Sequence, residues 1–211
     1  MPDTALKTAR PVMPDALAGA FAFVDTLHAD GMGGILNSPC LPSPTLSAAL
    51  GCDVVVKLEN LQATGSFKER GAFARLSALT PAERARGVVA ASAGNHAQGV
   101  ARHASAMGIH ATIVMPEGTP MVKVHQTRAL GADVDITGAD FDAAKAHALD
   151  LSAQTGAVFV HPFDDEEIVA GHGSAGLEIL EQAHDVEVVV VPIGGGGLIS
   201  GIAGAIKSQK P

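Results

Sequence analysis

Short runs rich in Val and Ile alternate with longer Ala-rich stretches along most of this 211-residue chain, and this alternation limits the fold more than any other feature. The runs have the length of buried strands, and the stretches between them have the length of helices. The strand-like runs are DVVVKL (53–58), GVVAA (87–91), ATIVM (111–115), ADVDI (132–136), AVFVH (157–161) and VEVVVVP (186–192). The helix-like segments cover about 66–79, 95–107, 120–130, 141–154, 167–183 and 197–208. This order predicts an α/β fold with three layers, in which open parallel sheets are flanked by helices on both faces.

Local signals place the ends of several helices. Thr80 followed by Glu83 has the spacing of a capping box, and Gly108 and Gly131 stand where helices should end before the next strand. In a parallel sheet of this kind, ligands bind at the carboxyl ends of the strands. The loops that follow the predicted strands are therefore the first places to look for chemistry.

Composition narrows the class of partner. Hydrophobic residues make up 47% of the chain, enough to bury a core. Acidic residues outnumber basic ones by 22 to 14, and the formal charge of −8 repels nucleic-acid phosphates and anionic lipid. Only Cys40 and Cys52 are present, and no run has the pattern of a membrane span or signal peptide. We therefore expect a cytoplasmic protein without nucleic-acid or membrane partners.

The first unusual loop is ENLQATGSFKERGA (59–72), in which Gly65 leads into a helix that opens with Ser66, Phe67 and Lys68. A helix N-terminus carries partial positive charge, so an ammonium there is disfavoured and the neutral amine is relatively favoured. A neutral lysine amine can form a Schiff base with a carbonyl compound. Taken alone, such a lysine is more often a solvated surface residue.

The second loop, SAGNHAQG (92–99), follows a predicted strand directly and opens a helix. Its free backbone N–H groups, together with the side chains of Ser92, Asn95 and His96, would form an anion site suited to a carboxylate. An ordinary strand-to-helix turn with Asn95 as a cap explains the same pattern.

The third loop, PIGGGGLISGIAG (192–204), places four consecutive glycines at the start of a helix. Without side chains, several N–H groups can converge on phosphate oxygens, although tight packing of the helix on the sheet is an alternative. No lysine follows in the P-loop position, and Ile199 and Ser200 stand where a dinucleotide fingerprint needs its third Gly or Ala. The pattern therefore disfavours a nicotinamide-dependent oxidoreductase and leaves a phosphate cradle for a smaller cofactor.

Together, a poised lysine, a carboxylate loop and a phosphate loop indicate pyridoxal phosphate (PLP), which bears an aldehyde and a phosphate and acts on amino acids. The segments KLENLQATGSFKERGA, SAGNHAQGVA and VPIGGGGLISG resemble the signatures of the threonine/serine dehydratase branch of fold-type II PLP enzymes, and the resemblance covers about residues 40–211. It implies that Lys68 is catalytic and forms the Schiff base with PLP. The other cofactor-binding residues it implies are Phe67 near the ring, Asn95 at the phenolic oxygen, and Gly194, Gly195, Gly196, Gly197 and Leu198 at the phosphate. The substrate carboxylate would be held by Ser92, Gly94, Asn95 and His96.

The implied reaction is elimination of water and then ammonia from L-threonine, giving 2-oxobutanoate, or from L-serine, giving pyruvate. Serine racemases, which resemble this chain closely, carry a serine at the position of Ala93 as the second proton donor. Because alanine cannot exchange a proton, racemisation by that route is disfavoured. A dehydratase or racemase of another β-hydroxy amino acid remains an alternative.

Two further stretches carry weaker signals. Asp164, Asp165, Glu166 and Glu167 precede a predicted helix and would complement its dipole, so we expect no metal ligands there. The stretch VAGHGSAGLEIL (169–180) resembles a family segment that usually has Gln at position 172 and Thr-Ile at 174 and 175. This chain departs from it with His172, Ser174 and Ala175.

The resemblance also predicts the domain organisation. Residues 1–71 and 158–211 would form a large PLP-binding domain whose C-terminal half is missing, and residues 72–157 a small domain. Relatives continue well beyond Pro211, where a further parallel strand is expected. A second functional class is therefore a non-catalytic or partner-dependent fragment of such an enzyme. We expect a homo-oligomer if the chain folds.

Overall fold

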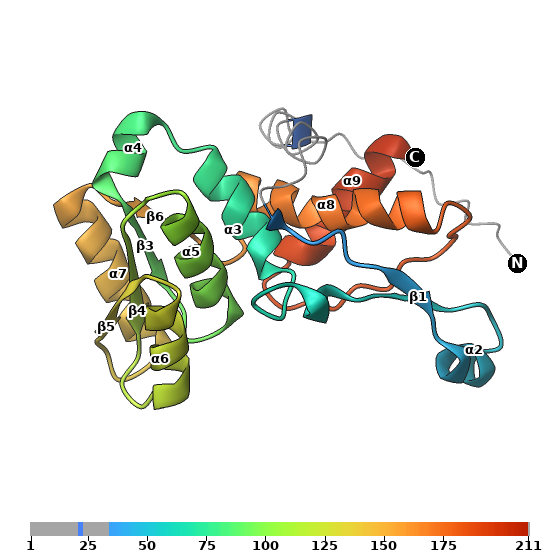
Figure 1. Cartoon of the computed structure of the whole chain (residues 1–211), viewed down its shortest axis with the longest axis horizontal. Coiled ribbons are helices and arrows are strands. Elements are labelled where there is room, and N and C mark those ends of the chain that lie inside the picture. The colour runs from blue at the N-terminus through green and yellow to red at the C-terminus, as the bar shows by residue number, and fades with distance from the viewer. Residues whose placement is uncertain (1–20, 23–33, 211) are drawn as a thin grey trace, which may run out of the picture.

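The computed structural model of the chain describes residues 21–22 and 34–210, and its elements follow the predicted alternation closely (Figure 1). The six predicted helices are all present, with ends within two residues of the expected ones. The strands are β1 (Cys40–Pro42), β2 (Val55–Lys57), β3 (Val88–Ala91), β4 (Ala111–Met115), β5 (Asp133–Ile136) and β6 (Val158–Phe159). The helices are α2 (Pro44–Leu50), the 3-10 helix η2 (Glu59–Leu61), α3 (Lys68–Ser77), α4 (Pro81–Arg86), α5 (Asn95–Ala106), α6 (Met121–Ala129), α7 (Phe141–Thr155), α8 (Glu166–Gln182) and α9 (Gly197–Gln209).

Four of the strands form a parallel sheet in the order β5-β4-β3-β6, which confirms the predicted α/β fold. Successive residues of β3 point to opposite faces, as a strand requires. Val88 and Ala90 belong to a core shared with α5 and α6, whereas Val89 and Ala91 belong to a core shared with α7. The sheet therefore lies between two layers of helices.

The predicted helix ends are also confirmed. Thr80 accepts a hydrogen bond from Glu83 N, and the Glu83 side chain accepts one from Thr80 N, so both halves of the capping box are formed. Gly108 and Gly131 adopt φ values of 67° and 95°, in the left-handed region that glycine reaches without steric cost. Gly108 lies between the end of α5 and the start of β4, and Gly131 lies between the end of α6 and the start of β5.

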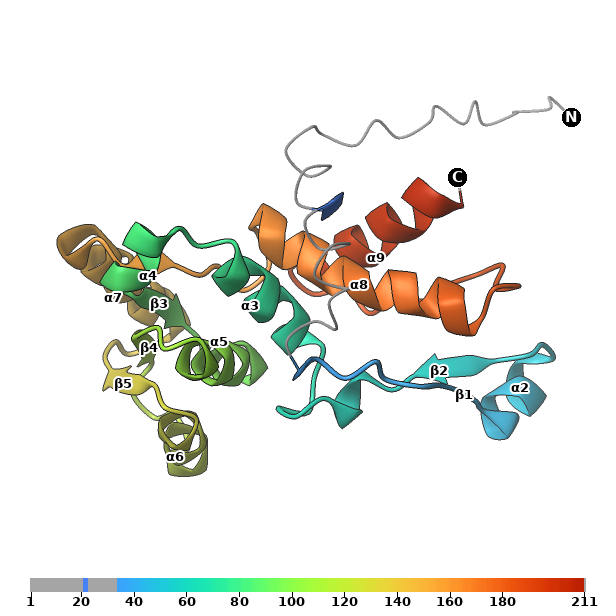
Figure 2. The same cartoon turned by 45° about the horizontal axis from the view of Figure 1, so that its top comes forward.

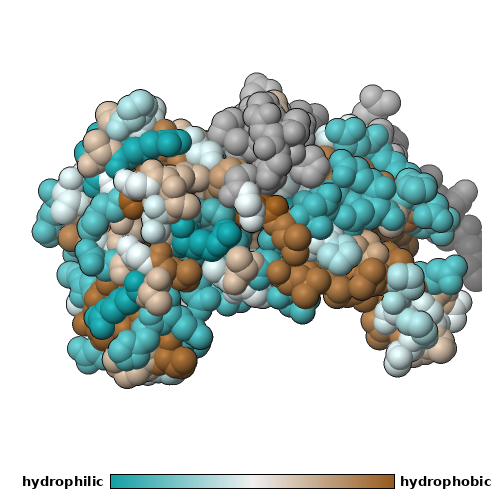
Figure 3. Space-filling model, viewed as in Figure 1, coloured by the Kyte–Doolittle hydropathy of each residue, from teal (hydrophilic) through white to brown (hydrophobic). Residues whose placement is uncertain are grey.

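Two strand predictions need correction. Residues 55–57 do form a strand, but it pairs antiparallel with β1, with Cys40 opposite Lys57, outside the parallel sheet. The run 186–192 is not a strand, because no other segment among the described residues lies alongside it to complete a ladder. Alternate side chains of the run stay in solvent, with Val188 76% and Val190 90% exposed, while Val189 and Val191 are half-buried. Figure 3 shows hydrophobic residues gathered on the face that carries β1.

Helix α3 lies between the parallel sheet with its helices and the pair α8–α9, and it packs against both α5 and α8 (Figures 1 and 2). Glycines allow the close approach to α8. A Cβ added at Gly171 would lie 2.6 Å from Arg70 O, and one added at Gly71 would lie 2.9 Å from Ile168 O. Among the described residues, none of the helices combines the length and apolar character of a membrane span.

A buried ion-pair cluster fixes α3 against its neighbours. The Arg70 guanidinium is fully buried and donates to both carboxylate oxygens of Glu178 at 2.7 and 2.8 Å and to both of Glu59 at 2.7 Å. Lys57 Nζ donates to Glu178 Oε2 from the far side, and Ser38 donates to Glu59. One cation therefore joins η2, α3 and α8.

Replacing Arg70 should destabilise the fold strongly. In Arg70→Met the buried carboxylate of Glu178 and the half-buried one of Glu59 lose their main partner, and breaking a buried pair of this kind costs about 3–5 kcal/mol. Urea unfolding followed by circular dichroism measures the change. Arg128→Met is the control, because Arg128 is exposed and its change should stay within about 0.5 kcal/mol. Equal midpoints for the two variants would show that the cluster is not a principal support.

Candidate active site

Lys68 opens helix α3, as predicted, and it is half-buried. Its Nζ atom donates a hydrogen bond to Pro162 O at 2.6 Å and lies 5.2 Å from the centroid of the Phe67 ring. Burial lowers the pKa of Lys68 below its ordinary value, because a charged amine loses hydration there. The helix N-terminus acts in the same direction. The Lys68 amine is therefore fixed by a hydrogen bond and partly desolvated, unlike the ammonium group of a solvated surface lysine.

The loop 92–99 leads from β3 into α5, which begins at Asn95. Gly94 is the N-cap residue, and no side chain caps the helix, so its first N–H groups are available. Ser92 Oγ accepts a hydrogen bond from Gly94 N at 3.1 Å, and Asn95 is exposed. His96 lies beneath this loop, with Nε2 3.0 Å from Val160 O, and burial lowers its pKa to about 4.

The glycine loop turns into α9, whose first residue is Gly197. Gly196 has φ +91° and caps the helix without a side chain. A side chain at Gly195 would overlap the Phe163 ring, and a Cβ at Gly197 would lie 2.8 Å from Phe163 O, whereas one at Gly194 would meet nothing within 4 Å. The loop is thus closed on the side of Phe163 and open on the other. An open set of backbone N–H groups at a helix start suits a phosphate.

Residues 160–163, called here the 160–163 segment, connect these three parts. Val160 O contacts His96 of the second loop, Pro162 O accepts from Lys68, and Phe163 packs against the glycine loop. Helix α5 also packs on the start of α3, since a Cβ at Gly99 would lie 3.4 Å from the backbone of Lys68 and Glu69. All three predicted loops therefore gather around one short segment.

The sequence analysis missed the 160–163 segment. A usable signal was present, because the segment follows β6 at the end of the predicted strand 157–161 and so occupies the carboxyl end of a strand in a parallel sheet. The residues other than His161 carry little obvious chemistry, however. Pro162 contributes a backbone carbonyl and Phe163 an aromatic ring, and neither has a motif of its own.

His172 lies directly behind the lysine-bearing turn. Its ring meets the ring of Phe67 edge to face, with centroids 4.9 Å apart and planes at 80°. Neither ring nitrogen has a hydrogen-bond partner among the described residues, and burial, with the nearby Lys68 ammonium, lowers the pKa of His172 well below its ordinary value. The neighbouring departure Ser174 accepts a hydrogen bond from Arg70 at 3.0 Å, and Ala175 is buried.

The acidic run before α8 has a structural role. Asp165 caps the helix by accepting from Ile168 N at 3.0 Å, and it pairs with Arg75 Nε at 2.9 Å. Glu166 and Glu167 fill the first turn, where negative charge complements the helix dipole. Within the described part of the chain, no three His, Cys, Asp or Glu side chains are grouped to hold a metal ion.

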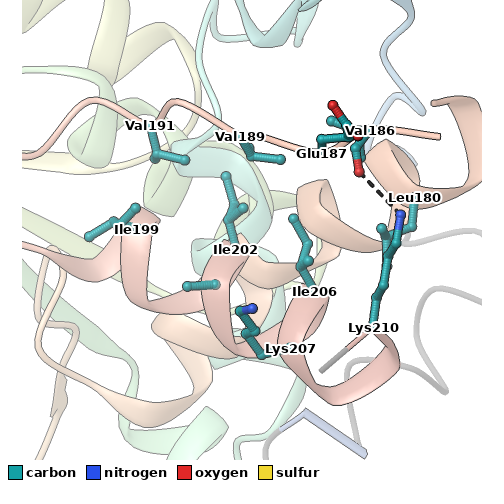
Figure 4. Close-up of a pocket in the computed structure, with 11 residues that line it drawn as sticks. Leu180, Val186, Glu187, Val189, Val191, Ile199, Ile202, Ile206, Lys207 and Lys210 are labelled. Carbon is teal, nitrogen blue, oxygen red and sulfur yellow. Dashed lines mark hydrogen bonds between the residues drawn. The ribbon is translucent and has the colours of Figure 1, made fainter. Parts of the chain in front are cut away.

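A separate cavity of about 510 Å³ lies between α9 and the run 186–191 (Figure 4). Val189, Val191, Ile202 and Ile206 line it, and Lys210 closes one end by donating to Val186 O at 3.1 Å. None of the predicted cofactor or substrate residues lines this cavity. The cavity lies where the unpaired run 186–191 crosses α9, and Lys68 does not line it.

Comparison with known proteins places the chain among enzymes of one kind. The family model described as "Pyridoxal-phosphate dependent enzyme" matches residues 32–211. The chain is 58% identical over 169 residues to an L-threonine ammonia-lyase of Thermotoga maritima, covering 80% of this chain and 42% of the relative. It is 47% identical over 178 residues to the catabolic L-threonine dehydratase TdcB of Staphylococcus aureus, covering 84% and 51%. The chain thus spans about half the length of these curated relatives.

Solved structures share the fold. The processed form of threonine deaminase isoform 2 from Solanum lycopersicum superposes with a TM-score of 0.89 at 40% identity, covering 96% of this chain and 58% of that one. Maize serine racemase superposes with a TM-score of 0.83 at 34% identity, covering 93% and 58%. Both structures therefore share the fold of this chain.

We predict that Lys68 titrates below a normal lysine in the cofactor-free chain. Reductive methylation with ¹³C-formaldehyde followed by NMR across pH gives the pKa of each dimethyl-lysine, and Lys68→Arg identifies the resonance. Burial should shift the midpoint of Lys68 downward, so the amine becomes neutral at lower pH than in a model peptide, where the value is about 10.4. A midpoint at or above the peptide value would contradict the proposed desolvation.

Proposed function

Because the chain belongs to the family of pyridoxal-phosphate dependent enzymes, we propose that it is part of an ammonia-lyase that converts L-threonine to 2-oxobutanoate and ammonia, or L-serine to pyruvate and ammonia. The observation that carries the proposal is the 160–163 segment, around which the lysine, the carboxylate loop and the glycine loop gather. The two curated relatives described above, which carry threonine ammonia-lyase and dehydratase names, support the choice of substrate.

The residues present fit PLP. Lys68 would hold the aldehyde carbon through its amine, and the open N–H groups of Gly194, Gly195, Gly196, Gly197 and Leu198 would hold the phosphate. Phe67 would pack near the pyridine ring, and Asn95 would contact its phenolic oxygen. When bound, the cofactor supplies an electron sink for negative charge that develops at the substrate Cα.

The chain's own residues would perform the remaining tasks. The free N–H groups at the start of α5, with Ser92, Gly94 and Asn95, would orient the substrate carboxylate, and His96 would complete the set from beneath. Lys68 Nζ would accept the Cα proton, and its lowered pKa leaves more of the amine in the neutral form that can accept one. The β-hydroxyl then departs as water by taking up a proton equivalent to the one that Lys68 removed from Cα, and addition of a second water molecule releases ammonia and the 2-oxo acid.

Ala93 favours elimination over racemisation, because its methyl group cannot deliver a proton to the opposite face of Cα. A dehydratase or racemase of another β-hydroxy amino acid is the alternative within this family, and the maize and Dictyostelium discoideum serine racemases share the fold. A partner-dependent or non-catalytic fragment of such an enzyme is the alternative from another class.

We also propose the organisation and setting of the protein. Residues 72–157 would act as a small domain, and residues 1–71 with 158–211 as part of the large one, supported by the separate cores of the sheet and of the α8–α9 pair. The protein would be a cytoplasmic homo-oligomer, supported by the free thiols of Cys40 and Cys52 and by the exposed apolar run 186–193.

We expect PLP to develop a visible absorbance band on the chain, and we expect L-threonine to give 2-oxobutanoate, measured by a coupled dehydrogenase assay. Lys68→Ala should lose both the band and product formation, because no other described residue offers a held amine at this site. Lys123→Ala, on the exposed face of α6, should keep both. Product formation that survives Lys68→Ala would refute the role given to Lys68, and absence of product from the unchanged chain would count against the enzyme assignment.

Two outcomes separate the alternatives. A band without release of 2-oxo acid from threonine or serine supports the partner-dependent fragment. Formation of D-serine from L-serine, measured by chiral chromatography, supports a racemase and contradicts the role given to Ala93.

A further inference from the structure

His161 stands in the middle of the 160–163 segment and is tied to both sides of it. Its Nδ1 atom accepts hydrogen bonds from two backbone groups, Asp164 N at 2.8 Å and Phe163 N at 3.3 Å. Its ring meets the Phe163 ring edge to face, with centroids 4.7 Å apart and planes at 84°. The imidazole thereby closes a tight turn over residues 161–164.

This turn sets two contacts of the candidate site. It presents Pro162 O to Lys68 Nζ at 2.6 Å, and it places the Phe163 ring against Gly195, where an added side chain would overlap it. A change in the turn would therefore move the lysine contact and the glycine loop together. Neither contact involves the His161 ring itself, so His161 acts through its neighbours.

We propose that His161 is a positioning residue of the cofactor site, whose neutral ring holds the 161–164 turn and so aligns Lys68 with the glycine loop. The inference rests on the proposed function and adds pH control to that site. Two N–H donors can share Nδ1 only if that atom keeps its lone pair, so the ring proton must lie on Nε2. Protonation of Nδ1 would point an N–H group at two others and open the turn.

The charges around His161 decide how easily that happens. Burial lowers its pKa, and Lys145 of α7 and Lys68 of α3 lower it further, while Asp164 and Asp165 in the turn and cap oppose them. The folded pKa is below the ordinary value of about 6.5. The stabilisation of the turn is therefore complete above that value and is lost as pH falls from there through the folded pKa.

Two substitutions separate the acceptor from the ring. His161→Asn keeps an acceptor, since an Asn side chain bonds the backbone N–H groups two and three residues ahead, but it does not titrate. His161→Phe keeps the ring that packs on Phe163 but has no acceptor. We expect His161→Phe to bind PLP roughly tenfold more weakly at pH 7.5, about the net worth of the two hydrogen bonds that the turn loses. His161→Asn should match the unchanged chain at that pH.

The pH profile is the decisive measurement. PLP affinity, titrated by absorbance from pH 5 to 8, should fall at low pH more steeply for the unchanged chain than for His161→Asn. Lys68 and PLP titrate in both proteins. The difference between the pH profiles of the unchanged chain and of His161→Asn therefore isolates the effect of His161. Identical profiles for the two proteins, or binding by His161→Phe equal to that of the unchanged chain, would overturn the proposal.

A second readout needs no cofactor. Long-range ¹H–¹⁵N NMR of the histidine ring in the cofactor-free chain should show Nδ1 without a proton, and the Asp164 amide should shift in His161→Phe but less in His161→Asn. A proton on Nδ1 at neutral pH would overturn the proposal. Failure of PLP to bind, with this tautomer observed, would count against the proposed function and leave the role of His161 in the turn supported. If His161→Phe does not fold, the proposal is tested by the pH profile of His161→Asn and by the ring tautomer of His161 in the unchanged chain.

Discussion

The buried guanidinium of Arg70 is the interaction on which the rest of the structure depends. It bonds the carboxylates of Glu59 and Glu178 at once and so fixes α3 between η2 and α8. Burying an unpaired arginine or carboxylate would be costly, so each partner requires the others to stay in place. Lys68 lies two residues before Arg70 in the first turn of the same helix, and its direction follows from this anchor.

The anchored lysine acquires its chemical character from its surroundings. Partial burial and the helix start both disfavour its charge, while Pro162 O holds the amine in one direction. The backbone carbonyl comes from a segment 94 residues further along the chain. The same segment reaches His96 through Val160 O and the glycine loop through Phe163, so a few backbone atoms organise a site whose conspicuous side chains lie elsewhere.

Burial of polar atoms without partners is concentrated around this lysine. Among the described residues, the buried side-chain atoms that lack a hydrogen bond are Thr64 Oγ1, His96 Nδ1 and the two ring nitrogens of His172. Such groups are rare in native proteins, where a catalytic role or a bound water or ion accounts for many of them. His172 touches Phe67, and Thr64 belongs to the loop that precedes Lys68, so the structure keeps its unpaired polar groups beside the candidate chemistry.

Six helices, the fold class and the three candidate loops could be predicted from the sequence alone, because strand and helix periodicity, the capping box at Thr80 and the glycine run are local features. The sequence did not determine which strands pair with each other. Residues 55–57 joined β1, and 186–192 stayed unpaired, since a strand needs a neighbour that periodicity cannot name. Only the tertiary structure revealed the 160–163 segment, the turn held by His161 and the cluster around Arg70. Each depends on contacts between residues far apart in sequence, and on backbone atoms that every residue type carries.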